Sequence, residues 1–528
     1  MAKRNNYKGK QNESKGSKFY NKGGRNRNAN REDKPARISD RTCNNSFNDP
    51  EWYNNNPDLL EAAARIPFAH VPGRAISIGD YADSEGVVRP ATEYLPGVMA
   101  IEYVPTIGYS ADVNSPASIA AREMYAKVRA KFSGTLVADA PDLMMYVLAL
   151  DSVYGYISYL MRLYKTINAF TAHNVYYPDP MLHAMGITSD AAIMDLRVNK
   201  TKLWGLINTL IQNSRKFRCP GKYDLLNRHF WMNQRIYSDA DSPKAQYYVF
   251  MPIHFYKFKE FSETGGGLEA FDFADELYQI CSEEEYIPGS IVDYLYSTGD
   301  EMISRLANSE DAYTINGYFE RAYEGESQFI IADLIEDDVV EIVYSPEVLM
   351  QIENSRTVVR DRFTPSDFDI TQDPSNNAII QVIKGNMNGS FNILLDYNGL
   401  NIHGGTPTPL GVAVATRLAC TQDINYVSEE VGYELTYHCG TELVIDYRFF
   451  YFSDEGLQEE VMSTYYTLEG ASDFIKALYH SSLMSSMDWH PIFVASLNMS
   501  AWVGKPEGHM MFGDLSNFTT IAPAQTLL

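Results

Sequence analysis

The feature that most constrains the fold is a long apolar stretch, residues 141–170, which reads PDLMMYVLALDSVYGYISYLMRLYKTINAF. Its apolar and aromatic residues recur at spacings of three and four, the pattern of a helix face. Thirty residues in one helix would span roughly 45 Å. Most of the other faces are apolar as well, so we expect this helix to be surrounded by protein. The rest of the chain should fold around it.

A membrane span is the competing interpretation of this stretch. Asp151 interrupts the apolar run and Arg162 closes it, so no uncharged segment of ~18 residues remains. An Asp at the centre of a bilayer costs about 2.5 to 3.5 kcal/mol. The sequence therefore favours a buried helix of a globular protein and predicts no membrane-spanning segment.

Asp151, Gly155, Ser158 and Arg162 follow one another at spacings of four, three and four, so they share one side of the predicted helix. A stripe of small and polar residues would let another helix approach closely. Because buried charges are normally paired, a satisfied polar seam is favoured over the alternative, a catalytic Asp151.

The charge of the chain is divided between a basic tail and an acidic body. Residues 1–41 contain 13 Lys or Arg and 4 acidic residues, so the net charge of −24 leaves −33 on residues 42–528. The tail is rich in Asn, Gly, Lys and Arg and has little to bury, which predicts a disordered arm. Such an arm would neutralise the phosphates of a nucleic acid, with a solubilising tail or a localisation signal as the alternative. The candidate RNA-binding residues are Lys3, Arg4, Lys8, Lys10, Lys15, Lys18, Lys22, Arg25, Arg27, Arg31, Lys34 and Arg37.

Motifs of catalysis and metal binding are not found in the sequence. It contains no HExxH, GxSxG or Gly-Asp-Asp motif and no Cys or His cluster with metal-ligand spacing, so we predict no cofactor, no metal and no enzyme. Self-processing of the N-terminal arm stays open. The chain opens without a hydrophobic signal peptide and its five Cys show no disulfide rhythm, which indicates a reducing, intracellular compartment.

Two further helices are expected beside the long one. Ser115 and Pro116 are predicted to begin a helix over 119–132, which carries Arg122, Lys127, Arg129 and Lys131. This basic helix either contacts nucleic acid or is a solvated face that pairs with acidic neighbours, and the second interpretation is favoured. Residues 190–214 are expected to form a third helix, so that the three helices make one layer.

Strands are expected mainly after Gly299, where runs of β-branched and aromatic residues replace helical spacing. These runs are 339–344, 378–383, 390–397 and 442–452, and an earlier strand is expected at 98–104. Hairpin turns are predicted at Asn388-Gly389 and Cys439-Gly440, and a flexible turn at the three glycines 265–267. From Glu455 onward helical spacing returns.

Three blocks of the chain resemble the capsid proteins of picobirnaviruses: PEWYNNNPDLLEAAARIPF (50–68), PGVMAIEYVPTIGYSADVNSPASIAAREMYAKVRA (96–130) and APDLMMYVLALDSVYGY (140–156). The resemblance covers roughly 45–240 and implies a largely helical shell domain, a projecting domain and dimers that build an icosahedral shell around double-stranded RNA. The expected fold class is mainly α with a β-rich module, an α+β protein. The expected domains are a disordered arm (1–45), a helical shell domain (46–324), a β-rich projecting domain (325–452) and a C-terminal segment that packs back on the shell (453–528).

The residue pattern agrees with this resemblance in kind. A Tyr-rich chain with long helices, no cofactor motif and one basic arm suits a self-assembling container for viral RNA, located in the virion and, during assembly, in the host cytoplasm. One alternative is a nucleoprotein that coats single-stranded RNA without closing a shell. Another is a hydrolase or protease acting on itself, for which the sequence offers no nucleophile.

Overall fold

The structure is a computed structural model of the 528-residue chain. It describes residues 75–82, 88–94, 97–169, 178–239, 245–262, 265–282, 286–355, 363–387, 393–395, 408–428, 432–453, 455–462, 466–467 and 499–501. The expected arm and the predicted turn Asn388-Gly389 lie outside these residues. The described part combines helices with several sheets, which confirms the predicted α+β class.

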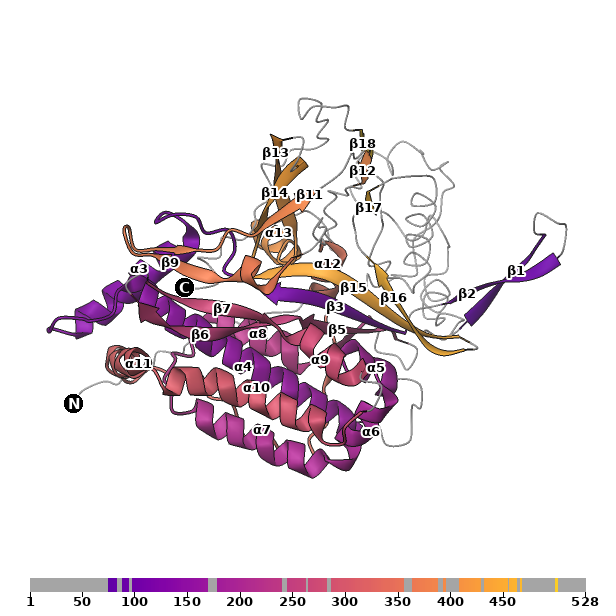
Figure 1. The fold of residues 1–528 in the computed structure, drawn as a ribbon, viewed down its shortest axis with the longest axis horizontal. Coiled ribbons are helices and arrows are strands. Elements are labelled where there is room, and N and C mark those ends of the chain that lie inside the picture. Colours follow the sequence, from indigo (N-terminus) through magenta and orange to yellow (C-terminus); the bar gives the residue numbers. More distant parts are fainter. Residues whose placement is uncertain are drawn as a thin grey trace, which may run out of the picture. The chain divides into compact units, whose positions relative to one another are not determined.

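A six-stranded sheet in the order β16-β15-β3-β5-β4-β8 occupies the centre of the fold (Figure 1). Its strands are β3 (Val98–Pro105), β4 (Ile236–Ser238), β5 (Tyr247–Pro252), β8 (Ile342–Tyr344), β15 (Glu442–Ser453) and β16 (Gly456–Met462). β3 pairs in parallel with β5 and antiparallel with β15, so that Val104 lies opposite Leu443. The strand predicted at 98–104 is confirmed, and it joins segments far apart in the sequence.

Both faces of β3 are buried, which explains why this strand is apolar at successive positions. Val98, Ala100 and Val104 belong to the main core, which also contains the buried side of the helices. The alternating residues Met99, Ile101 and Tyr103 belong to a second core, with Val348, Leu349 and Ile352 of α12 (Pro346–Glu353). A one-residue shift in register would exchange these two sets, so the two cores fix the pairing.

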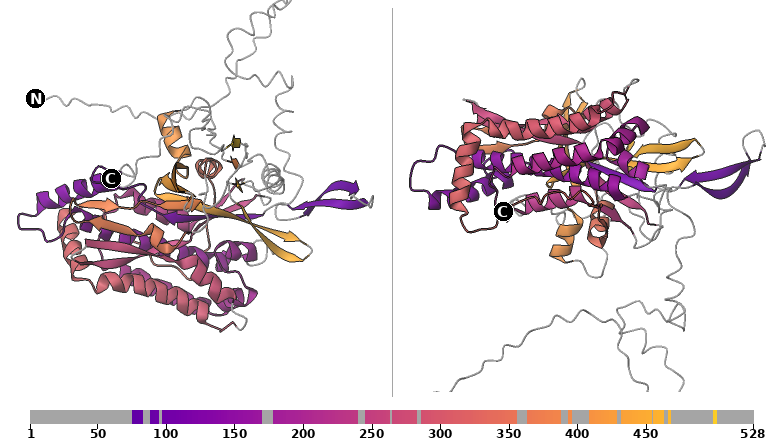
Figure 2. Two further views of the ribbon diagram at one scale, coloured as in Figure 1. Left: turned by 45° about the horizontal axis from the view of Figure 1, so that its top comes forward. Right: turned by 90° about the horizontal axis from the view of Figure 1, so that it is seen from below.

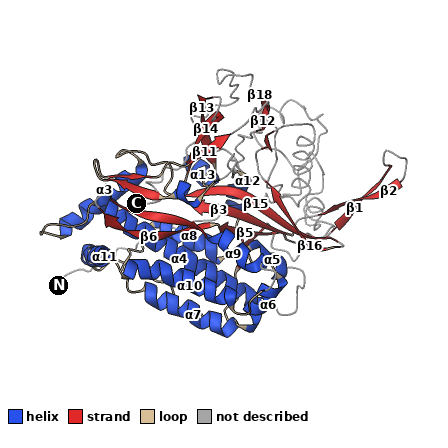
Figure 3. Cartoon of the chain, in the orientation of Figure 1, coloured by secondary structure: helices blue, strands red, loops and turns tan. Residues whose placement is uncertain are grey.

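A layer of helices covers one side of the strands (Figures 1 and 3). It is built on α4 (Ala140–Ala169), which confirms the predicted long helix and is buried at every residue from Leu143 to Tyr164. α7 (Lys200–Ser214) and α10 (Ser290–Ala307) run beside it (Figure 2). Gly299 of α10 allows this approach, because a Cβ there would lie 2.7 Å from a methyl carbon of Leu210 and 3.0 Å from the ring of Tyr156.

Two tyrosines of α4 connect it to neighbouring segments of this layer, since each buries its ring and donates a hydrogen bond from its hydroxyl. Tyr156 donates to the carbonyl of Leu295, 2.6 Å away, and Tyr159 donates to that of Met185, also at 2.6 Å. Among the described residues, α4 is the one helix long and apolar enough to cross a membrane, and its most apolar 18-residue window is entirely buried in protein. Its apolar surface is therefore used for packing.

The remaining helices are shorter and surround these layers. They are α3 (Pro116–Lys131), α5 (Pro178–Ala184), α6 (Asp190–Val198), α8 (Asp224–Gln234), α9 (Phe273–Ser282), α11 (Glu310–Ala322), α13 (Pro409–Ala415) and the 3-10 helix η2 (Pro365–Phe368).

Four smaller sheets complete the described strands. A four-stranded sheet has the order β10-β9-β7-β6, two three-stranded sheets have the orders β11-β14-β13 and β17-β12-β18, and β1 pairs with β2. Their strands are β1 (Ala75–Ala82), β2 (Val88–Tyr94), β6 (His254–Ser262), β7 (Gly265–Asp272), β9 (Ile370–Asp373), β10 (Ala378–Ile380), β11 (Lys384–Met387), β12 (Ile393–Leu395), β13 (Cys420–Ser428), β14 (Gly432–Cys439), β17 (Tyr466–Thr467) and β18 (Met499–Ala501).

The prediction of one helix over 190–214 is wrong in one respect. The segment is helical, but it is divided at Asn199 into α6 and α7. Asn199 has φ −93° and ψ 17°, and its side-chain amide donates to the carboxylate of Asp195 at 2.7 Å. The backbone amide of Asn199 still donates to the carbonyl of Asp195, so the break is a local change of backbone angles that the apolar spacing alone did not reveal.

The flexible turn predicted at the three glycines is also wrong. Gly265 to Gly267 begin strand β7, and β6 and β7 form a hairpin. A Cβ on Gly267 would lie only 2.8 Å from the carbonyl oxygen of Ile370 in β9. The glycine is needed for close approach of two backbones, a use of glycine in strands that composition does not distinguish from a turn.

Cys439-Gly440 is not a hairpin turn. β14 ends at Cys439 and pairs with β11 and β13, whereas β15 begins at Glu442 and pairs with β3 and β16. The dipeptide therefore passes the chain from one sheet to another. Helical spacing is predicted from Glu455 onward, but the described residues of this segment form strands. β16 pairs with β15, and β17 and β18 pair with β12.

Two further predictions need correction. α11 and α12 lie within the region expected to be β-rich after Gly299. Ser115 precedes α3 as expected, but its hydroxyl accepts hydrogen bonds from the amides of Ala111 and Asp112 and does not cap the helix. The helix itself begins at Pro116, as the sequence predicts.

Candidate functional site

The polar seam predicted on α4 is packed against α8. Asp151 Oδ2 lies 2.6 Å from Nδ1 of His229, and both side chains are buried. One turn later, a Cβ on Gly155 would lie 3.5 Å from the side-chain amide of Asn233 and 3.8 Å from the ring of Phe255. The small residue therefore allows α8 and β6 to approach α4 closely, as the spacing predicts.

Arg162 ends the seam and is completely buried. Its guanidinium donates to the carbonyl oxygen of Phe250 at 2.7 Å and to that of Met232 at 3.4 Å. Burial lowers the pKa of Arg162 to about 10, so the side chain remains charged at neutral pH. The carbonyls of β5 and α8 compensate this charge where a carboxylate was expected.

Glu442 at the start of β15 is the centre of a buried charge cluster that we define as Asp151, His229, Glu442, Arg228 and Arg417. One oxygen of Glu442 accepts from Arg228 Nε at 2.7 Å and lies 3.4 Å from both Arg417 Nη2 and His229 Nε2. It also accepts a hydrogen bond from the hydroxyl of Thr441 at 2.6 Å. These contacts connect α4, α8, β15 and the residues after α13 in one network.

Electrostatics favour the ionised forms of Glu442 and His229 in the buried charge cluster. Burial opposes ionisation of Glu442, but Arg228 and Arg417 outweigh it and hold the pKa of its carboxyl well below the usual range. Burial likewise opposes the charge of His229, while Asp151 and Glu442 raise its pKa to about 9. At neutral pH the ionised Glu442 thus lies against the protonated His229 and beside the two arginines.

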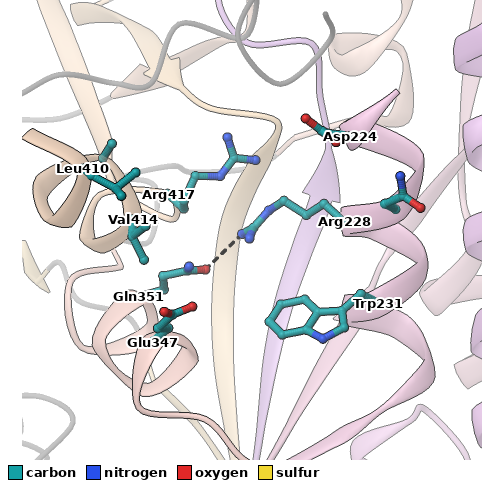
Figure 4. A pocket seen from close by; sticks show the side chains of 10 residues that line it. Asp224, Arg228, Trp231, Glu347, Gln351, Leu410, Val414 and Arg417 are labelled. Carbon is teal, nitrogen blue, oxygen red and sulfur yellow. Dashed lines mark hydrogen bonds between the residues drawn. The ribbon is translucent and has the colours of Figure 1, made fainter. Parts of the chain in front are cut away.

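A cleft of about 600 Å³ opens above this cluster, between α8, α12 and α13 (Figure 4). Arg228 and Trp231 project into it, and Arg228 donates to the amide oxygen of Gln351 at 3.1 Å. The lining residues are Asp224, Asn227, Arg228, Trp231, Glu347, Gln351, Leu410, Ala413, Val414 and Arg417. Among the described residues, the lining carries charged, amide and apolar groups but no Ser, Thr or Cys, and Arg228 and Arg417 are engaged with Glu442.

The catalytic interpretation of Asp151 receives no support from this geometry. Its partner His229 is held in the buried charge cluster between two carboxylates. In the part of the chain that the structure describes, no group of three or more His, Cys, Asp or Glu is placed to hold a metal ion. The cluster is best understood as a polar core that fixes α4, α8 and β15 relative to one another.

The sequence predicted the α4 side of this cluster but missed the rest. His229, Arg228 and Arg417 belong to segments without a recognisable motif, and Glu442 begins a run interpreted only as a strand. A charged residue at the start of an otherwise apolar strand was the one available signal, since a fully buried Glu requires partners. Their identity depends on contacts between residues as far apart as 151 and 442.

The candidate RNA-binding residues of the arm all lie outside the described residues: Lys3, Arg4, Lys8, Lys10, Lys15, Lys18, Lys22, Arg25, Arg27, Arg31, Lys34 and Arg37. The basic helix 119–132 is described, as α3. Lys127 pairs with Glu326, and Arg129 donates to the carbonyl oxygens of Phe132 and Gly134. Arg122 and Lys131 are exposed and have no ion pair with any described carboxylate. The expected pairing with acidic neighbours therefore accounts for Lys127 alone.

Comparison with known proteins identifies the kind of fold. The chain is similar to the protein in an X-ray crystallographic structure of the picobirnavirus capsid, with a TM-score of 0.63, 19% sequence identity, and coverage of 91% of this chain and 96% of that one. It is also 29% identical over 430 residues to the capsid protein precursor of a human picobirnavirus (strain Human/Thailand/Hy005102/-), covering 76% of this chain and 74% of the relative. A sequence model described as "Picobirnavirus, Capsid protein" matches residues 52–434.

These similarities, together with a fold built for extensive packing, define a structural protein of a virus particle. The chain belongs to the picobirnavirus capsid protein family, because the family model covers more than two thirds of its length. The resemblance found in three blocks of the sequence is thereby confirmed. A capsid protein is a component of the virion, which agrees with the predicted location.

Proposed function

We propose that this capsid protein assembles from dimers into an icosahedral shell that encloses double-stranded RNA, and that its basic arm contacts the RNA. The observation that carries the proposal is the separation of charge, with +9 on residues 1–41 and −33 on the rest of the chain. A strongly acidic body repels RNA from most of its surface. The genome would then be held by the cationic arms rather than along the whole wall, while assembly takes place in the host cytoplasm.

Counterion release gives this arrangement a measurable signature. Each phosphate neutralised by Lys or Arg releases bound cations, so affinity for RNA falls steeply with salt and shows no sequence preference. The candidate contacts are the twelve arm residues Lys3, Arg4, Lys8, Lys10, Lys15, Lys18, Lys22, Arg25, Arg27, Arg31, Lys34 and Arg37. We expect full-length protein to bind duplex and single-stranded RNA alike.

Deletion of residues 1–41 tests the role of the arm. Truncated protein should still form shells but should contain little RNA, and most of the steep salt dependence should be lost with the arm. Electron microscopy and the absorbance ratio of purified particles measure both outcomes. If the truncated protein fails to assemble, the arm connects subunits of the shell. If it assembles with a normal RNA content, the RNA is bound by the body and not by the arm.

The second candidate function is an RNA-binding nucleoprotein that coats single strands without a closed shell. The exposed cations Arg122 and Lys131 on α3 favour it, since they lie on the body rather than on the arm. Electron microscopy of purified protein separates the two functions directly. Closed shells support a capsid, and filaments support a nucleoprotein.

We also propose that residues 46–324 form the shell domain, that residues 325–452 contain the outward projection, and that 453–528 pack back on the shell. The small sheet β11-β14-β13 is our candidate for the projection, because hairpins tolerate variation that a packed layer does not. β15 pairs with β3 in the central sheet, although it lies before the proposed boundary at residue 452. The boundary is therefore placed by the sequence pattern and does not coincide with the edge of a sheet. An insertion between Asn388 and Gly389 should leave assembly intact, and loss of particles would place this region in the shell.

A further inference from the structure

One patch of the acidic body concentrates positive charge, and we call it the basic surface cluster: Lys127, Lys131, Lys222 and Arg321. Two helices and a loop bring these residues together, since Lys127 and Lys131 belong to α3, Lys222 precedes α8 and Arg321 belongs to α11. Lys127 Nζ lies 4.0 Å from the centroid of the Tyr323 ring, and Lys222 Nζ lies 5.2 Å from the same centroid. Two ammonium groups therefore share one aromatic ring.

The aromatic residues beneath the cluster fix its geometry. Tyr323 is 1% exposed, and its hydroxyl is hydrogen-bonded to that of Tyr223 at 2.5 Å. Arg321 lies over the ring of Phe132, 5.2 Å from its centroid. These rings hold the cationic groups in place from below, so less conformational entropy is lost when a ligand binds from above.

The cluster has more positive charge than its described partners neutralise. Glu326 forms an ion pair with Lys127, but no described carboxylate forms one with Lys131, Lys222 or Arg321. Burial lowers the pKa of Lys222, and repulsion by the nearby charge of Lys127 lowers this pKa further. An anion placed between these side chains would relieve that repulsion.

The chemistry of the cluster selects the RNA backbone as its partner. Tyr323 is buried and cannot stack on an unpaired base, so the accessible groups are the ammonium and guanidinium ions. Such groups contact phosphates without reading sequence, and in an RNA duplex the phosphates and 2′-hydroxyls are the accessible features. The patch is thus suited to a duplex backbone.

We propose that the basic surface cluster is a second RNA contact, located on the folded body, that binds the phosphate backbone of the enclosed duplex. This inference rests on the proposed function, since it requires that the shell encloses RNA. The RNA would then have a fixed contact on the body in addition to the arm. The negative net charge of the body gives no indication of this contact.

The test uses full-length subunits and a short RNA duplex, with affinity measured across a range of salt concentrations. The Lys131→Gln/Lys222→Gln double variant removes two cations that have no ion pair with a described carboxylate. We expect the slope of log affinity against log salt to become less steep by about 2, because each phosphate contact contributes about 1. The Lys131→Arg/Lys222→Arg variant keeps both charges and should retain the wild-type slope.

A matched control removes the same charge elsewhere. Arg197 and Lys202 are already paired, with Asp179 and Asp293, so Arg197→Gln/Lys202→Gln should leave the slope unchanged. If the double variant fails to fold, the single exposed substitutions Lys131→Gln and Arg321→Gln replace it, and each should reduce the slope by about 1.

The remaining outcomes are distinguishable. Wild-type protein that does not bind RNA would overturn the proposed function itself. Wild-type protein that binds RNA, with an unchanged slope in the cluster variants, would overturn only this inference. Loss of particles with unchanged RNA binding would also overturn it, and would show that the cluster faces an acidic surface of a second copy of the chain.

Discussion

The buried charge cluster and the basic surface cluster use similar side chains in opposite ways. In the first, Glu442 is surrounded by Arg228, Arg417 and His229, and the charges compensate one another inside the protein. In the second, Lys127 has one partner in Glu326, while the cations beside it have no ion pair with a described carboxylate. Charges that are satisfied internally fix the fold, whereas charges left open at the surface are available to a partner.

The largest expected effect comes from breaking the buried charge cluster. Glu442→Gln keeps the shape of the side chain but leaves two arginines and a histidine without their central carboxylate. We expect a loss of about 3 to 5 kcal/mol in the free energy of unfolding, the usual cost of an uncompensated buried charge. Denaturant unfolding and soluble yield measure it.

Glu434→Gln is the matched control for this variant. Glu434 pairs with Lys384 in an exposed position, so its removal should cost less than about 1 kcal/mol. Equal effects of the two substitutions would show that burial does not distinguish the clusters, and the comparison would fail.

The pH dependence of stability sharpens the same contrast. The pKa of His229 is raised from 6.5 to about 9 in the folded protein, so its contribution is complete below pH 6.5 and is lost as the pH rises through 9. A shift of this size corresponds to about 3 kcal/mol. Urea midpoints between pH 7 and 9.5 should fall for the wild type but fall less for His229→Gln.

His438→Gln serves as the control for the pH experiment, because His438 pairs with Asp423 in a more exposed position. It should retain the wild-type fall in stability at alkaline pH. If His229→Gln and wild type lose stability equally between these pH values, protonated His229 does not hold the buried charge cluster together.

A smaller effect is expected from overfilling the seam beside the buried charge cluster. Gly155→Leu adds a side chain where a Cβ already contacts Asn233 and Phe255, so it should cost about 1 to 3 kcal/mol and reduce soluble protein. Gly155→Ala should be tolerated, since a Cβ fits at ordinary contact distance. Gly205→Leu on α7, with nothing within 4 Å of a Cβ, is the control. Normal shells from Gly155→Leu would contradict close packing at this position.

The smallest effect on stability is expected at the surface. Lys127→Gln removes the ion pair between Lys127 and Glu326, two side chains that are 31% and 41% exposed. The free energy of unfolding should fall by about 0.2 to 1 kcal/mol. The same substitution should measurably weaken RNA binding if the basic surface cluster contacts phosphates. A fall in the melting temperature of more than a few degrees would show that Lys127 acts mainly in the stability of the fold and not in RNA binding.

The sequence alone determined the elements whose pattern is local. The spacing of apolar residues over 141–170 predicts α4 almost to the residue, and Pro116 marks the start of α3. The α+β class, the strand β3 and the close approach at Gly155 follow from the same kind of information. Each depends on residues within a few turns, where periodicity and side-chain size are sufficient.

The tertiary structure alone decided how distant segments meet. It placed β15 beside β3, brought Glu442 to His229, and used Gly267 for a close approach to Ile370 rather than for a turn. It also gathered Lys127 and Lys222 over one tyrosine ring. These contacts join residues that are roughly 95 to 350 positions apart, and no local pattern of the sequence specifies them. For the strands the reason is physical, because the pairing of two strands is decided by the burial of both faces of the sheet at once.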